Sequence, residues 1–153
     1  EIDALHTALA SSTFYSHPKE VRRLFPDFIT VERDYYRKTR FFPIMHTIVI
    51  RRDVYEANRW VAQSLYKAFI ESQRRTYASM REYAALKTML PWLISHVEDL
   101  DREMGPDWWP YGLEANRHEL ETFLKHHHRQ GLSKGLLKPE DLFAPETSEA
   151  FKI

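Results

Sequence analysis

Residues 41–50 read Phe41-Phe42-Pro43-Ile44-Met45-His46-Thr47-Ile48-Val49-Ile50, and this stretch decides the fold that the sequence predicts. Apolar side chains occupy both odd and even positions of the stretch, and three β-branched residues end it. That pattern is typical of a strand covered on both faces, as in a parallel or mixed α/β sheet. We therefore predict a strand over residues 42–50 and an α/β fold class. Such a strand would span roughly 30 Å.

His46 is the one titratable residue within this predicted strand. An imidazole titrates near neutral pH, so His46 could act as a general acid or base, or donate a hydrogen bond to a substrate. The alternative is a structural histidine that satisfies a hydrogen bond in the core. Both interpretations stay open at this point.

Composition narrows the class of protein. A chain of 153 residues predicts one domain with a sizeable core. Its 22 basic and 22 acidic residues balance, so the charge indicates neither nucleic acid nor an anionic membrane as a partner. No apolar run reaches the length of a membrane span. The absence of cysteine excludes disulfides and thiolate chemistry and is compatible with the cytoplasm.

Helical periodicity dominates the rest of the chain. A capping-box pattern at Asp53 and Glu56 opens a helix that continues to about Met89, with Val61, Leu65 and Phe69 packed in one core. Further predictions follow from caps, prolines and glycines: a loop over residues 6–17, a helical turn over 19–25, a helix over 30–38 capped by Thr30, a helix from Pro91 to Gly105, an aromatic loop over 107–113, and a helix from a capping box at Asn116 and Glu119 to Gly131.

A strand covered on both faces needs neighbouring strands. The only other candidate is Glu1-Ile2-Asp3-Ala4-Leu5, which reads as the end of a strand. We therefore expect the sequence to be part of a larger α/β protein, and we expect this polypeptide alone to expose apolar surface and to associate.

Four clusters are candidates for binding. The run His126-His127-His128 cannot converge on one metal ion, because successive helical residues diverge by about 100°, so a solvated helix end is favoured. The pairs Arg22-Arg23 and Arg51-Arg52 could clamp a carboxylate or remain solvated. Trp108-Trp109-Pro110-Tyr111 could line a pocket for a flat ring or pack as a surface loop.

Several motifs together resemble the 4,5-dihydroxyphthalate decarboxylase family. They are E-I-D-A-L (1–5), V-R-R-L-F-P-D (21–27), Y-Y-R-K-T (35–39), F-P-I-M-H-T-I-V-I-R-R-D-V-Y (42–55), W-V-A-Q-S-L-Y-K-A-F (60–69), W-P-Y-G-L-E-A-N-R (109–117) and L-F-A-P-E-T (142–147). The similarity runs in register over nearly the whole chain and matches the C-terminal half of the family sequence.

The resemblance implies a fold of the type 2 periplasmic-binding-protein-like superfamily, here partial. Residues 1–40 would be the end of the second lobe, residues 41–52 the return hinge strand, and residues 53–153 a helical C-terminal part packing on the first lobe. The missing N-terminal half of the same fold would then be a partner. The chain departs from the family at Arg40-Phe41, where a glycine is expected before F-P-I-M-H, and at Arg59, where a proline is expected. The second departure predicts that two helices merge into one.

The resemblance also implies decarboxylation of a dihydroxylated aromatic dicarboxylate, with a small aromatic acid as ligand and no cofactor required. A site for this reaction needs an acid/base group, cations for the carboxylates and a flat apolar wall. As a hypothesis from residue chemistry, we assign the catalytic role to His46. We assign substrate binding to Arg23, with Arg22 or Arg51 as alternatives, and to Thr47, Trp109 and Tyr111. No metal ligand is assigned.

The same fold also captures solutes, so a binding module of an ABC transporter and an inactive fragment remain alternatives. The enzyme would be cytoplasmic, whereas a transporter component would be periplasmic. A homo-oligomer is compatible with the sequence.

Overall fold

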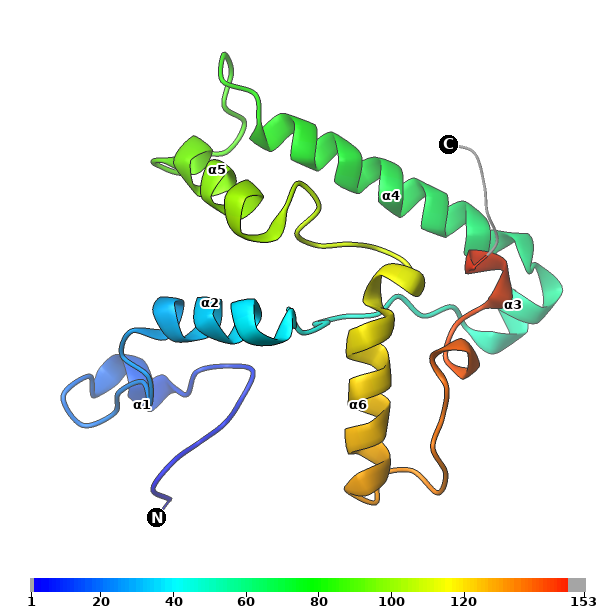
Figure 1. Ribbon diagram of the computed structural model, residues 1–153, viewed down its shortest axis with the longest axis horizontal. Helices are drawn as coiled ribbons and strands as arrows, with labels where there is room; N and C mark the ends of the chain where they lie inside the picture. Colours follow the sequence, from blue (N-terminus) through cyan, green and yellow to red (C-terminus); the bar gives the residue numbers. More distant parts are fainter. Residues whose placement is uncertain (1, 149–153) are drawn as a thin grey trace. The chain divides into compact units, whose positions relative to one another are not determined.

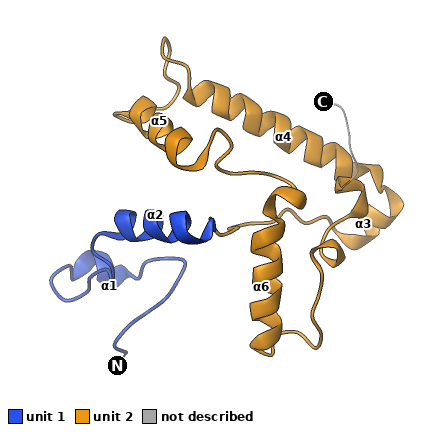
Figure 2. Ribbon diagram, viewed as in Figure 1, with its two compact units in different colours: residues 1–42 blue, residues 43–153 orange. Residues whose placement is uncertain are grey.

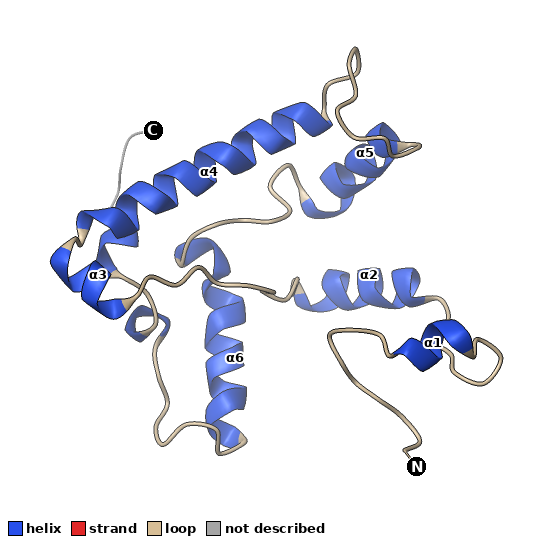
Figure 3. Cartoon of the chain, turned by 180° about the vertical axis from the view of Figure 1, so that it is seen from behind, coloured by secondary structure: helices blue, strands red, loops and turns tan. Residues whose placement is uncertain are grey.

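The ten residues around His46 form neither a strand nor a helix. In the computed structural model, which describes residues 2–148, they connect α2 (Phe28–Thr39) to α3 (Arg52–Ala57). Met45, Ile48 and Val49 are 63%, 56% and 85% exposed. Among the described residues there is no strand (Figure 3). The prediction of an α/β fold, with its partial type 2 periplasmic-binding-protein-like sheet, is therefore wrong.

The physical reason lies in what a strand requires. Apolar residues on both parities favour an extended backbone, but a sheet forms only where a neighbouring segment supplies hydrogen bonds. The second candidate strand does not do so, because residues 2–5 have no regular structure. Every other long described segment carries helical periodicity instead.

The chain divides into two compact units, residues 1–42 and residues 43–153 (Figure 2). The first unit contains α1 (Ser12–Ser16) and α2. Helix α1 lies in the stretch predicted as a loop, and the turn predicted over residues 19–25 is not helical. The described part of this unit contains no fully buried residue.

Helix α2 begins and ends with defined local contacts. The Asp27 carboxylate accepts a hydrogen bond of 3.3 Å from the backbone N–H of Thr30, so Asp27, and not Thr30, caps the helix. At the other end Arg40 adopts the left-handed conformation with φ 60°, and its N–H donates to the Tyr36 carbonyl over 2.7 Å. An arginine thus takes a conformation that usually favours glycine.

The second unit is built from helices joined by loops (Figure 1). After α3 come α4 (Trp60–Met80), α5 (Leu93–Met104), the 3-10 turn η1 (Glu114–Asn116), α6 (Arg117–Arg129), and the 3-10 turns η2 (Pro139–Asp141) and η3 (Pro145–Thr147). Helix α4 ends nine residues earlier than predicted. The predicted ends at Gly105 and Gly131 are confirmed, and both glycines have positive φ.

Two predictions for this region are wrong: that α3 and α4 merge into one helix, and that Asp53 and Glu56 form a capping box. Asn58 has φ −146° and ψ 62°, which interrupts the helix even without a proline at position 59. The Asp53 carboxylate pairs with Arg51 and caps no N–H group. Arg59 instead lies 3.3 Å from Glu146, which also accepts a 2.6 Å hydrogen bond from the Tyr55 hydroxyl. These contacts hold η3 against the beginning of α4.

The buried core of the second unit is small. Besides Pro139 of η2, its buried apolar residues are Ala62, Leu93, Val97, Leu113, Leu120 and Leu124. They come from α4, α5, α6 and the residue before η1; α4 contacts α5 and η3, and α6 contacts η1 and η2. The predicted core of Val61, Leu65 and Phe69 is wrong, because Leu65 and Phe69 are each 37% exposed. Phe69 instead begins the helix face that forms the pocket described next.

Candidate functional site

A pocket of about 310 Å³ lies between α4 and the aromatic loop after α5. From α4 it is lined by Phe69, Ser72, Gln73, Thr76, Tyr77 and Met80. From the loop it is lined by Trp108, Trp109 and Tyr111. This volume is at the lower end of the range for sites that bind small molecules.

The spacing of the α4 residues explains how one helix supplies most of the lining. The six residues follow one another by three, one, three, one and three positions. Side chains separated by three or four residues project from one face of a helix. The aromatic residues of the loop lie against this face, so the lining combines aromatic rings with the polar groups of α4.

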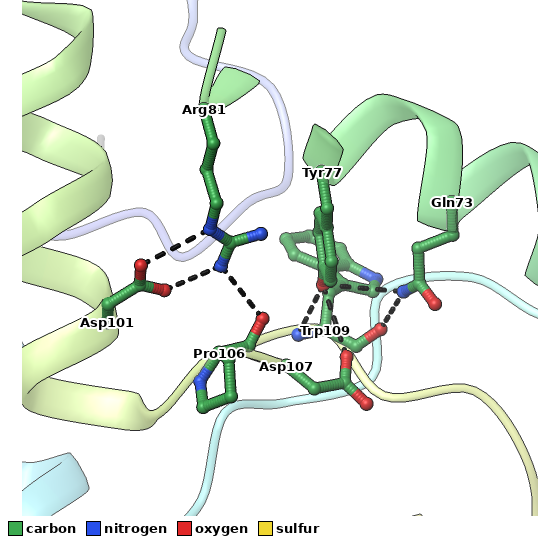
Figure 4. A network of polar contacts seen from close by, with 7 residues as sticks. All are labelled: Gln73, Tyr77, Arg81, Asp101, Pro106, Asp107 and Trp109. Carbon is green, nitrogen blue, oxygen red and sulfur yellow. Dashed lines mark hydrogen bonds and ion pairs between the residues drawn. The ribbon is translucent and has the colours of Figure 1, made fainter. Parts of the chain in front are cut away.

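The Tyr77 hydroxyl is the centre of the contacts that join the loop to α4 (Figure 4). It accepts a hydrogen bond of 3.0 Å from the backbone N–H of Trp109 and donates one of 3.3 Å to the Asp107 carboxylate. The Gln73 amide donates to the same hydroxyl over 3.4 Å and also to the Trp109 carbonyl. Both backbone polar groups of Trp109 are therefore held by α4.

The phenol of Tyr77 is made less acidic by this position. Burial, reinforced by the negative charge of Asp107, raises the pKa of Tyr77 to about 12. The hydroxyl therefore stays protonated at neutral pH and continues to donate to Asp107.

Arg81 joins α4 to α5 and to the aromatic loop through an ion pair, hydrogen bonds and cation–π contacts. Its guanidinium donates to the Asp101 carboxylate over 2.6 and 3.3 Å and to the Pro106 carbonyl over 3.0 Å. The guanidinium carbon lies 5.5 Å from the centre of the Tyr77 ring and 4.8 Å from the Trp108 ring. Arg81 therefore joins α4, α5 and the loop in one cation–π and ion-pair cluster.

Asn116 and Gly112 fix the far end of the aromatic loop. The Asn116 amide donates to the carbonyls of Pro110 and Gly112, each over 2.8 Å, and so spans Tyr111. This replaces the capping box predicted at Asn116, whose side chain caps no N–H group of α6. Gly112 has φ +99°, and a Cβ there would lie 2.2 Å from the Tyr66 hydroxyl. Only glycine fits at this position without a shift of its neighbours.

The structure brings together two of the predicted site residues, Trp109 and Tyr111, in the lining of the pocket. His46 and Thr47 lie exposed on the extended segment of the same unit. The Arg51 guanidinium donates to Asp53 over 2.5 and 2.6 Å, so its charge is compensated locally. Arg23 belongs to the first unit.

The Arg23 guanidinium is engaged by aromatic rings within its own unit. Its carbon lies 5.4 Å from the centre of the Phe14 ring and 4.6 Å from that of Phe28. No carboxylate partner of Arg23 is found among the described residues, so its positive charge is held by ring faces alone.

Sequence reasoning missed Gln73 and Tyr77, which organise the pocket. The available signal was the i, i+4 pairing of these two residues with Phe69 on one helix face. The sequence predicts Phe69 in the core with Val61 and Leu65, and it predicts the aromatic loop as a separate cluster.

Two features are not found among residues 2–148: a cluster of metal ligands and a membrane-spanning helix. Within residues 2–148 no three histidine, aspartate or glutamate side chains come together to hold a metal ion. The Nδ1 atom of His127 is buried without a hydrogen bond, and its ring lies 5.6 Å from that of Phe123. No described helix is long and apolar enough to cross a membrane.

Comparison with known proteins gives one similarity over the whole chain. The sequence is 35% identical over all 153 residues to 4,5-dihydroxyphthalate decarboxylase from Comamonas testosteroni. It spans about half of that relative, 46% of its length, consistent with a C-terminal half. The resemblance expected from the motifs is thereby confirmed. No model of a protein family matches the chain.

Proposed function

We propose that the chain serves in the decarboxylation of a dihydroxylated aromatic dicarboxylate, such as 4,5-dihydroxyphthalate, to protocatechuate. The observation that carries the proposal is the 35% identity, over all 153 residues, to a protein named for this reaction. The aromatic pocket supports it independently, because three loop aromatics and a helix face suit a flat ring.

The chemistry follows from the substrate class. A hydroxyl para to a carboxylate supplies electron density to the ring carbon that bears the carboxylate, and an acid protonates that carbon. The bond to the carboxylate then breaks, carbon dioxide leaves, and the bonding electrons return to the ring, which becomes aromatic again. The protein must supply one proton, position the ring and balance the carboxylate charges, so the reaction requires no organic cofactor.

We assign the proton to His46, whose exposed imidazole has no hydrogen-bond partner among the described residues. Trp109 and Tyr111 are assigned the ring faces. Arg23, Arg51 and Thr47 remain the candidates for the carboxylates. Of the two arginines, Arg23 is the better candidate, because its charge is not already paired with a carboxylate, whereas Arg51 is paired with Asp53.

The test uses the purified full-length protein and two substrates. Carbon dioxide release should be catalysed from 4,5-dihydroxyphthalate and not from phthalate, which lacks the electron-donating hydroxyls. The arginines are tested by Arg23→Gln and Arg51→Gln, with the exposed Arg52 changed to Gln as the matched control. Replacing an arginine that binds a substrate carboxylate should raise KM, whereas Arg52→Gln should leave it unchanged. Absence of carbon dioxide release from both substrates contradicts the proposed function.

A further inference from the structure

We infer that the pocket between α4 and the aromatic loop receives the hydroxyl edge of the substrate ring, and that the carboxylates remain outside it. This deepens the proposed function and rests on it. The inference follows from which polar atoms the lining offers and which charges it lacks.

The described residues that line the pocket include no charged side chain. A carboxylate that lay against this lining would therefore find no cation among its side chains. Arg81 is close, with its guanidinium over the rings of Tyr77 and Trp108, but Asp101 already holds it through two hydrogen bonds. The dicarboxylate edge therefore has no partner inside this pocket.

A phenolic hydroxyl, in contrast, finds partners there. The Gln73 side-chain nitrogen is used by Tyr77 and Trp109, and its carbonyl oxygen takes no hydrogen bond from the described residues. The Ser72 hydroxyl is likewise unpaired within residues 2–148, since only its backbone carbonyl is engaged, by Thr76. Both residues line the pocket, so its lining offers one free acceptor and one free hydroxyl to a phenolic substrate.

The Gln73 carbonyl oxygen is oriented by the rest of the amide. Because the nitrogen donates to the Trp109 carbonyl and to the Tyr77 hydroxyl, the amide plane cannot rotate freely. Figure 4 shows the nitrogen directed into this network and the oxygen directed away from it. Gln73 is thus a specificity residue: its carbonyl oxygen accepts a hydrogen bond from a hydroxyl and repels an anionic oxygen.

This orientation has a consequence for the reaction. In 4,5-dihydroxyphthalate the two hydroxyls lie on the edge of the ring opposite the two carboxylates. A ring held by its hydroxyl edge presents both carboxylates at the mouth of the pocket, so the cation and the proton donor must come from residues outside the lining.

The experiment uses two probes, catechol with only the hydroxyl edge and phthalate with only the carboxylate edge. Titration calorimetry on the full-length protein measures the Kd of each. Ser72→Phe fills the pocket from an exposed helical position, and Ser64→Phe makes the same change on α4 away from the pocket. We expect Ser72→Phe to raise the Kd of catechol about tenfold or more, which corresponds to about 1.4 kcal/mol. Ser64→Phe should change it less than about twofold.

The Kd of phthalate should rise less in Ser72→Phe than that of catechol, because phthalate has no hydroxyls for the pocket to bind. If the Kd of phthalate rose as much as that of catechol, the inferred orientation of the ring would be wrong. If the Kd of catechol did not change, this pocket would not be the binding site. Failure of the proposed function looks different: catechol binding would respond to Ser72→Phe while no carbon dioxide is released. If decarboxylation proceeds with an unchanged kcat/KM in Ser72→Phe, the pocket inference fails and the proposed function stands.

Discussion

The backbone N–H of Trp109 donates a 3.0 Å hydrogen bond to the Tyr77 hydroxyl. This bond joins a residue of the aromatic loop to the middle of the pocket face of α4. Together with the Gln73 amide it holds both polar groups of the Trp109 backbone. The wall of the pocket is therefore set by two α4 side chains, and the predictions below test that dependence.

Tyr77→Phe keeps the ring, and with it the Trp108 contact at 4.6 Å between ring centroids, but removes the hydroxyl. The Trp109 N–H then loses its partner, and we expect the free energy of unfolding to fall by about 1 to 2 kcal/mol. Tyr83→Phe is the matched control, because the Tyr83 hydroxyl donates only one 3.3 Å bond and the residue is 68% exposed. Chemical denaturation measures both. If the free energy of unfolding fell equally in both variants, the Tyr77 hydroxyl would not stabilise the aromatic loop.

The raised pKa of Tyr77, about 12, makes stability depend on alkaline pH. In the unfolded chain the phenol titrates near the ordinary pKa of about 10. Between these values the folded state binds more protons than the unfolded state, so this contribution to stability is complete below pH 10 and is lost as pH rises toward 12. Ultraviolet titration of tyrosinate in wild type and Tyr77→Phe measures the shift. The variant should lack the step near pH 12; identical curve shapes would contradict the assignment.

Gly112→Ala should destabilise the protein for two separate reasons. The φ of +99° disfavours any side chain by about 1 kcal/mol, and a Cβ would lie 2.2 Å from the Tyr66 hydroxyl. We expect a total loss of about 2 to 3 kcal/mol in denaturant unfolding. Gly135→Ala is the control, because no atom lies within 4 Å of its Cβ and its φ is not in the left-handed region.

The steric part is isolated by repeating the change in a Tyr66→Phe background. Without the hydroxyl, the loss caused by Gly112→Ala should fall to about 1 kcal/mol, the conformational part alone. A loss of the same size in both backgrounds would show that Tyr66 is not the obstacle.

The sequence predicts the helical half of this structure better than its extended part. The helix ends at Gly105 and Gly131 were predictable because a glycine with positive φ ends a helix by local chemistry alone. The strand over residues 42–50 was wrong for the complementary reason. Apolar and β-branched residues specify an extended backbone, but pairing depends on another segment, which local sequence does not reveal.

For the site, the aromatic wall was predictable and its organisation was not. Trp109 and Tyr111 stand out by composition. The roles of Gln73 and Tyr77 come from contacts to backbone groups of the loop at sequence separations of 36 and 32 residues, which only the tertiary fold reveals. Asn116 holds carbonyls six and four residues away, because an amide that could cap a helix can equally bond to nearby backbone groups.

His46→Asn tests the proposed source of the proton. His46 is exposed and has no hydrogen-bond partner among the described residues, so the change should alter the free energy of unfolding by less than about 0.5 kcal/mol. Decarboxylation should fall by about 10²-fold or more, the usual effect of losing a general acid or base. His126→Asn, at an exposed histidine near the end of α6, is the control and should leave the rate unchanged. A lowered melting temperature with normal turnover would assign His46 a structural role.

The most direct test of the account is product analysis after the full-length protein is incubated with 4,5-dihydroxyphthalate in deuterium oxide. Protonation of the ring carbon followed by loss of the carboxylate predicts equal amounts of carbon dioxide and protocatechuate, with one deuterium on the carbon that the carboxylate has left. Recovery of unchanged substrate, or protocatechuate without deuterium at that carbon, would contradict it.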